Sequence, residues 1–168
     1  MVLSAAVLLL AACGTDDSAA TKSTSVKSDD KEVFKIGVTQ IVEHPSLNAA
    51  YEGFQKAIED AGLEVEYQYE NAQNDNSLNS TIANNLVNSG ADLIFANSTP
   101  SAQAVAALTE DIPIVFTSVT NAVDAELVDS MESPGGNVTG TVDTQPDAIP
   151  NTIAFLKNEL GAKNVGMV

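Results

Sequence analysis

Polar side chains that could bind a small molecule stand directly after three apolar stretches of the sequence. They are hydroxyl and amide residues, in three groups: Gln40; Asn97, Ser98 and Thr99; and Thr117, Ser118 and Thr120. Side chains of these types bind by donating and accepting hydrogen bonds. The three groups are therefore candidates for one polar binding pocket, if the fold brings them together.

The chain lacks the partners that catalysis would need beside these groups. It holds one histidine, His44, and one cysteine, Cys13, which are far apart in the sequence. A covalent mechanism needs a nucleophile with a base, and a structural zinc site needs several Cys or His ligands. The glycines do not follow a nucleotide-binding pattern. We therefore predict a binding protein without a cofactor or metal, and a structural role for His44.

The elements that must position the polar groups alternate along the chain. Short apolar stretches predict strands over residues 33–40, 63–70, 91–98 and 112–119, and helical spacing predicts helices over 46–62, 77–90 and 99–111. Such an alternation indicates an α/β fold with a doubly wound parallel sheet. Residues 63–70 alternate apolar and polar side chains, as in an edge strand. Ligands of such sheets sit beyond the carboxyl ends of the strands, where the three polar groups occur.

The helix predicted from Thr99 carries Pro100 in its first turn. The N–H groups of a first turn have no partner within the helix, and the helix dipole favours negative charge there. This helix start is therefore a candidate anion site, with the Ser98 and Thr99 hydroxyls beside it. The alternative is a plain N-cap by Ser98 or Thr99.

The first residues of the chain indicate export. Residues 2–10 are uncharged and mostly aliphatic, but too few to span a bilayer. Leu10-Ala11-Ala12-Cys13 resembles the bacterial lipobox, although no basic residue precedes the apolar stretch. The resemblance implies a signal peptide over 1–12 and a lipid anchor on Cys13, and the polar segment 13–32 reads as a flexible tether. A truncated membrane helix or a buried apolar helix is the alternative.

The remainder of the chain is acidic and long enough for one domain with a real core. The formal net charge is −16, and all seven basic residues are lysines. Nucleic-acid binding depends on cationic contacts with phosphates. We therefore expect no nucleic-acid partner.

Three blocks of sequence resemble the substrate-binding lipoproteins of ABC transporters, in the tryptophan- or aromatic-amino-acid-binding branch. They are "IGVTQIVEHPSLNAAYEGFQKAIEDAG", "ADLIFANSTPSAQAVAALTEDIPIVFTSVTNAV" and "SPGGNVTGTVD". The resemblance implies a type I periplasmic-binding-protein fold of two α/β lobes with the ligand between them. Residues 33–140 would form the first lobe, and 141–168 the hinge crossing and the start of the second, including a helix over 151–160 and a strand over 164–168. The chain would then be an N-terminal fragment; a self-contained single domain is the alternative.

The resemblance also implies a function. The protein would capture a small molecule, with an aromatic amino acid favoured, outside the cell membrane and deliver it to permease subunits with a cytoplasmic ATPase. Asp143, on the crossing segment, could pair with the ligand ammonium or be a surface acid. Two other functions stay open: a binding module that feeds a signalling receptor, and a secreted α/β enzyme whose catalytic groups lie in a missing half.

Overall fold

The apolar stretches of the sequence form a parallel sheet in the computed structural model, which describes residues 32–166. The strands are β1 (Val33–Gln40), β2 (Glu64–Asn71), β3 (Leu93–Asn97), β4 (Ile114–Val119) and β5 (Val138–Val142). They form a five-stranded sheet in the order β2-β1-β3-β4-β5, and every neighbouring pair is parallel. The predicted α/β class is confirmed.

Some predictions concern the N-terminal part of the chain. The signal peptide over 1–12, the anchor at Cys13 and the tether as far as residue 31 lie outside the described residues. Within residues 32–166, every helix is too short or too polar to cross a bilayer.

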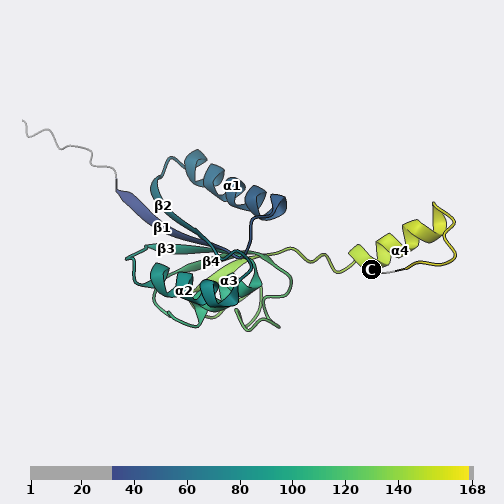
Figure 1. The fold of residues 1–168 in the computed structure, drawn as a ribbon. Coiled ribbons are helices and arrows are strands. Elements are labelled where there is room, and N and C mark those ends of the chain that lie inside the picture. The colour runs from purple at the N-terminus through teal and green to yellow at the C-terminus, as the bar shows by residue number, and fades with distance from the viewer. Residues whose placement is uncertain (1–31, 167–168) are drawn as a thin grey trace, which may run out of the picture. The chain divides into compact units, whose positions relative to one another are not determined.

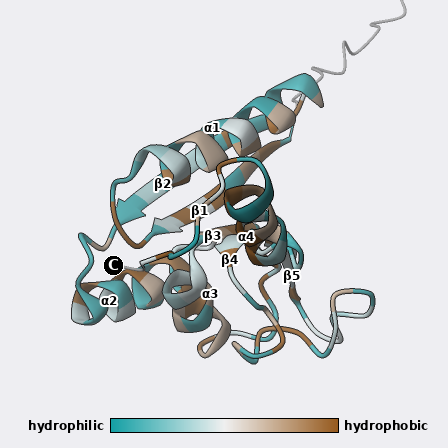
Figure 2. Ribbon diagram, turned by 90° about the vertical axis from the view of Figure 1, so that its right-hand side faces the viewer, coloured by the Kyte–Doolittle hydropathy of each residue, from teal (hydrophilic) through white to brown (hydrophobic). Residues whose placement is uncertain are grey.

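The helices of the described residues are α1 (Pro45–Asp60), α2 (Asn76–Val87), α3 (Thr99–Ala106) and α4 (Ala148–Asn158). The first three of them cover the two faces of the sheet (Figure 1). The helix α1 covers one face, while α2 and α3 cover the other. Figure 2 shows the hydrophobic residues of the central strands between these layers. The core is accordingly divided into two clusters, one on each face of the sheet.

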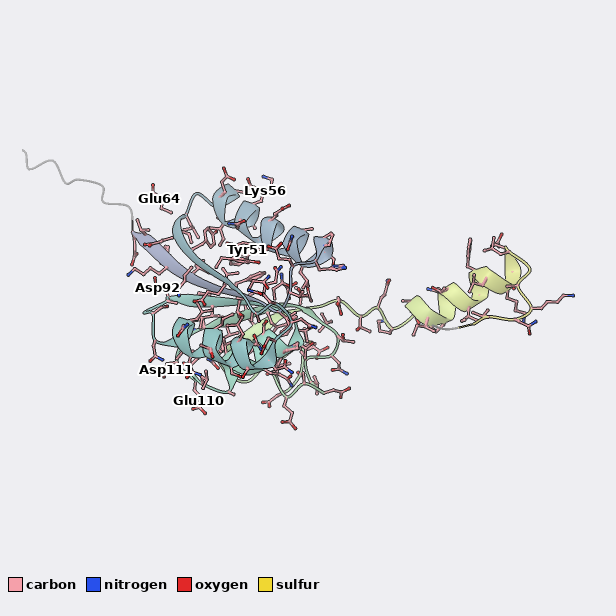
Figure 3. All side chains as sticks on the ribbon, viewed as in Figure 1. Tyr51, Lys56, Glu64, Asp92, Glu110 and Asp111 are labelled. Atoms are coloured by element: carbon pink, nitrogen blue, oxygen red, sulfur yellow. The ribbon has the colours of Figure 1, made fainter. Side chains whose placement is uncertain are left out.

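Aromatic rings fill the smaller of these clusters. Tyr51 of α1 lies between the helix and the sheet (Figure 3), where it stacks on Tyr69 at 5.3 Å and meets Tyr67 edge-on at 6.1 Å between ring centroids. Phe54 stacks on Phe95 at 4.2 Å. Burial, and secondarily the neighbouring tyrosines, raise the pKa of Tyr51 above its usual value. The phenol is therefore neutral at physiological pH, and the cluster acts as packing.

The strand β2 lies at the edge of the sheet, as its alternating pattern predicts. Its aromatic side chains point toward α1, and the intervening residues face the other way. Among these, Glu64 and Glu66 are exposed. The free edge of the sheet is therefore lined with carboxylates.

Several helix boundaries differ from the predicted ones, and the structure shows a local reason for two of them. The helix α1 starts at Pro45 because His44 is its N-cap, with Nδ1 accepting from the Ser46 N–H at 3.3 Å. The helix α3 ends at Ala106, not at residue 111. There the Thr109 hydroxyl accepts from the N–H groups of Asp111 and Ile112, both at 3.2 Å. This side-chain turn competes with continuation of the helix.

The segment after β4 also departs from the predictions. The limit expected at residue 140 falls inside β5, which pairs with β4. The helix expected over 151–160 covers Ala148–Asn158, and all its residues are at least partly exposed. The strand predicted over 164–168 is wrong for residues 164–166, which belong to no strand. A strand needs a neighbour to satisfy its backbone groups.

Gly140 allows β4 and β5 to approach closely. A Cβ atom there would clash with the Phe116 carbonyl oxygen and would lie 2.7 Å from two atoms of the Phe116 ring. The clash involves backbone, so it cannot be relieved by a rotamer change. We expect Gly140→Val to lower the free energy of unfolding by about 1–3 kcal/mol, measured by urea titration with circular dichroism.

A second glycine serves as the control. Gly53 lies within α1, and a Cβ there would meet no atom within 4 Å. Gly53→Ala should raise stability by about 0.5–1 kcal/mol, because alanine loses less backbone entropy in a helix. Equal unfolding midpoints for Gly140→Val and the parent chain would contradict the proposed packing role.

Candidate ligand-binding edge of the sheet

The carboxyl ends of β1, β3 and β4 stand level with one another. In the strand register Gln40 pairs with Asn97, and Asn97 pairs with Thr117. The three polar groups noted in the sequence therefore begin at one edge of the sheet. Thr120 and Asp143 follow β4 and β5, are exposed, and form no part of the buried polar cluster.

The innermost of these residues bond to each other. Gln40 and Asn97 have no exposed surface, and Asn97 Nδ2 donates to Gln40 Oε1 at 2.9 Å. Asn97 Nδ2 also donates to the Leu47 carbonyl at 2.8 Å. Gln40 Nε2 donates to the Val42 carbonyl at 2.9 Å and to Asn48 Oδ1 at 2.7 Å. The two amides thus tie β1 and β3 to the first turn of α1.

One atom of this network has no partner in the structure. Asn97 Oδ1 is buried and accepts no hydrogen bond. A buried acceptor without a donor costs free energy, so such an atom needs a physical explanation. Asn97 directly precedes Ser98, the residue at which the chain passes from β3 into α3.

Ser98 holds an unusual backbone conformation. Its φ of 114° and ψ of 160° lie in a region that is almost restricted to glycine and that costs about 1–3 kcal/mol for other residues. The Ser98 N–H donates to the Thr117 carbonyl at 3.0 Å, and the Ser98 carbonyl accepts from the Ala102 N–H at 3.0 Å. These two bonds hold the strained residue from both sides.

The strain leaves the first turn of α3 without a side-chain cap. Ser98 is the N-cap residue, but its side chain makes no capping hydrogen bond. Instead, its Oγ lies 3.4 Å from Ser101 Oγ. Pro100 has no N–H, so the first-turn donors are the N–H groups of Thr99 and Ser101. The predicted plain N-cap by Ser98 is therefore wrong, and Thr99 is the first helical residue, half-buried.

A β-bulge shapes the neighbouring strand end. The pairing of β4 with β5 shifts between Phe116 and Val119, so Thr117 and Ser118 together oppose a single residue, Thr141. Ser118 has a φ of 55°, and Thr117 Oγ1 lies 3.2 Å from Thr141 Oγ1. Bulges of this kind redirect side chains at sheet ends. Both hydroxyl residues are half-buried beside the uncapped helix start.

Sequence reasoning missed the residues that support this edge from other elements. Asn48 and the Leu47 carbonyl support it from α1, and Asn79 from α2. Polar residues in a predicted helix usually face solvent, so the sequence carries no signal for these contacts. Among residues 32–166, no three or more His, Cys, Asp or Glu side chains lie close enough to hold a metal ion.

The comparison with known families identifies the chain. Residues 35–168 match the family described as ABC transporter substrate binding protein. The chain belongs to this family. A curated relative, a tyrosine-binding protein of Clostridioides difficile (strain R20291), is 42% identical over 167 residues, covering 96% of this chain and 48% of that protein. The chain thus spans about half the length of this relative.

Two solved structures resemble the fold. One is the ABC domain from Streptococcus pneumonia in complex with L-Trp: TM-score 0.71, 36% identity, covering 75% of this chain and 43% of that one. The other is the ligand-free, open structure of a substrate binding protein with adhesive properties from Clostridium difficile: TM-score 0.69, 44% identity, covering 74% and 43%. The predicted type I periplasmic-binding-protein-like lobe is confirmed.

The buried amide pair should stabilise the lobe even without ligand. Asn97→Ala would leave the buried Gln40 Oε1 without a donor and would remove the additional bond to the Leu47 carbonyl, which we expect to cost about 1–3 kcal/mol of unfolding free energy. The control is Asn84→Ala, an exposed amide on α2, which should change stability by no more than about 0.5 kcal/mol. Urea titration without ligand gives both values. Equal effects of the two substitutions would contradict the structural role of Asn97.

Proposed function

We propose that the protein binds a free amino acid, an aromatic one, and holds the ligand carboxylate at the start of α3. The observation that carries this proposal is the uncapped first turn of α3 beside the strained residue Ser98. A helix start with unbonded N–H groups and a favourable dipole stabilises a negative charge. Strain of this type persists at binding sites, where the surrounding structure enforces it.

Lys35 and Lys56, the two lysines of residues 32–142, are not alternatives for this carboxylate. The chain has no arginine. Lys35 lies near the start of β1, at the opposite end of the strand from Gln40. Lys56 lies on the outer side of α1 (Figure 3), bonded to Asp60 at 2.8 Å. In a protein of net charge −16, the backbone N–H groups are therefore the donors best placed to bind an anion.

The choice of an aromatic amino acid depends on the relatives. One is named a tyrosine-binding protein, and another was solved with L-Trp. We propose that Ser98, Thr99, Thr117 and Ser118 bind the ligand directly, and that Gln40 and Asn97 support them from beneath. Thr120 and Asp143 lie further out, and we propose that they contact the ligand from the rim. We further propose that residues from 141 onward lead into a second lobe, which closes over the ligand.

We also propose where the protein works. A substrate-binding protein of an ABC importer captures its solute outside the cell membrane and passes it to permease subunits with a cytoplasmic ATPase. The lipobox-like sequence before Cys13 supports anchoring of the protein to that membrane by lipid. Binding and delivery need no chemistry on the solute, so we propose no enzymatic activity.

The carboxylate assignment predicts the effect of a double substitution. In the protein at the full length of its relatives, Ser98→Ala with Thr99→Val should weaken L-tryptophan or L-tyrosine binding by about tenfold to several hundredfold, because hydrogen bonds to a charged group contribute about 1.5–3 kcal/mol each. Ser80→Ala with Thr81→Val, an exposed pair on α2, is the control and should leave affinity unchanged. Calorimetry measures both. The assignment fails if the wild type binds the amino acid amide as tightly as the acid.

The anchor is tested separately. Expressed in a bacterial host, the protein should incorporate labelled fatty acid and partition into detergent. Cys13→Ser should abolish both, because the thiol is the acylation site. Equal membrane association of Cys13→Ser and the parent would show that the N-terminal apolar segment, and not a lipid, holds the protein.

A further inference from the structure

Asn79 lies on α2, and its side chain reaches the first turn of α3. It is 4% exposed, although it belongs to a helix rich in solvent-facing asparagines. Its Nδ2 donates to the Pro100 carbonyl at 3.0 Å, and its Oδ1 lies 3.5 Å from Ser101 Oγ. The first contact is a well-formed hydrogen bond and the second a longer one. One carboxamide therefore holds the first turn of α3 at two consecutive residues.

A line of polar atoms continues from Asn79 to the strained residue. Ser101 has no exposed surface, and its Oγ lies between Asn79 Oδ1 and Ser98 Oγ, which is 3.4 Å away. While the Ser98 hydroxyl faces Ser101, it does not cap its own helix. If it did turn to cap the helix, it would occupy an N–H group that a bound anion needs.

We propose that Asn79 is a positioning residue for the anion site at the start of α3. The proposal builds on the carboxylate assignment above. Asn79 makes no contact with the ligand itself. It fixes the first turn of α3 through Pro100, and through Ser101 it keeps the Ser98 hydroxyl away from the helix N–H groups. Asn79 thus keeps the N–H groups at the start of α3 available for the ligand carboxylate.

An amide at this position also has an electrostatic consequence. A carboxylate in its place could not donate to the Pro100 carbonyl, and it would carry a negative charge close to the helix start. Negative charge there interacts favourably with the helix dipole, so the substitution should not unfold α3. It would, however, compete with a ligand carboxylate for the same positive potential. Ligands that carry no carboxylate would not meet this competition.

The experiment compares two ligands and two variants in the protein at the full length of its relatives. L-Tryptophan and L-tryptophanamide are titrated by calorimetry into the wild type, Asn79→Asp and Asn84→Asp. Asn84 lies on the same helix but is exposed, and its Nδ2 bonds to the Ser80 carbonyl at 2.8 Å. The control variant therefore adds the same charge to α2 without touching α3.

We expect Asn79→Asp to reduce the preference for acid over amide by at least about tenfold, equivalent to about 1.4 kcal/mol. Asn84→Asp should leave the preference within about twofold of the wild-type value, because charges on the solvated surface are screened. A purely structural role for Asn79 would weaken the binding of both ligands equally and leave the preference unchanged. That outcome would overturn the proposal.

Failure of the underlying assignment gives a different result. If the wild type itself shows no preference for the acid, the carboxylate is not held at α3, and both proposals fall together. If the wild type prefers the acid and Asn79→Asp keeps that preference, only the positioning role of Asn79 is wrong.

A second variant covers the case in which Asn79→Asp does not fold, as judged by its thermal melting curve. Ser101→Ala removes the hydroxyl between Asn79 and Ser98 with little change in volume, and frees the Ser98 hydroxyl to cap the helix. We expect it to reduce the acid preference by about threefold or more. An unchanged preference in Ser101→Ala would then overturn the proposal.

Discussion

The side chains of Gln40 and Asn97 meet at 2.9 Å between two neighbouring strands, and neither has any exposed surface. Parallel strands are not joined by a hairpin that would align them. Their register therefore depends on contacts between residues that are distant in the sequence. Here the contact joins residues 57 positions apart. Because Asn97 Nδ2 also bonds to the Leu47 carbonyl, the same pair holds the first turn of α1 against the sheet. The positions of Ser98, and hence of the start of α3, follow from this bond.

Two segments of irregular backbone lie side by side at the carboxyl ends of β3 and β4, next to the Gln40–Asn97 pair. The strained residue Ser98 ends β3, and the bulge at Thr117 and Ser118 occupies the end of β4. The hydrogen bond from the Ser98 N–H to the Thr117 carbonyl connects them. Regular strands would carry their side chains alternately above and below the sheet. The irregular ends instead bring Thr117, Ser118 and the first turn of α3 together at the carboxyl ends of the strands.

The sequence predicts the regular part of this fold and the strand ends at which the polar side chains gather. Hydrophobic spacing predicts the strands and helices, and Gly62, with a φ of 71°, closely follows the end of α1. The sequence cannot show that Gln40 and Asn97 bond to each other, since the same amides would suit a ligand. Nor does it show that Asn79 faces α3, because its neighbours on α2 face solvent. Such contacts depend on how the layers pack, and hydrophobic periodicity carries no information about polar partners.

The exposed glutamates of β2 affect the association of these molecules with one another at high local concentration. A sheet edge offers unpaired backbone groups to any other edge, and two such edges can join into a larger aggregate. Two β2 strands joining in this way would bring the exposed Glu66 side chains of both molecules onto one face, where like charges repel. Anchoring to a membrane, as proposed above, would raise the local concentration of these edges. Repulsion between the glutamates opposes such joining, and it acts away from the carboxyl ends of β1, β3 and β4, where the candidate site lies.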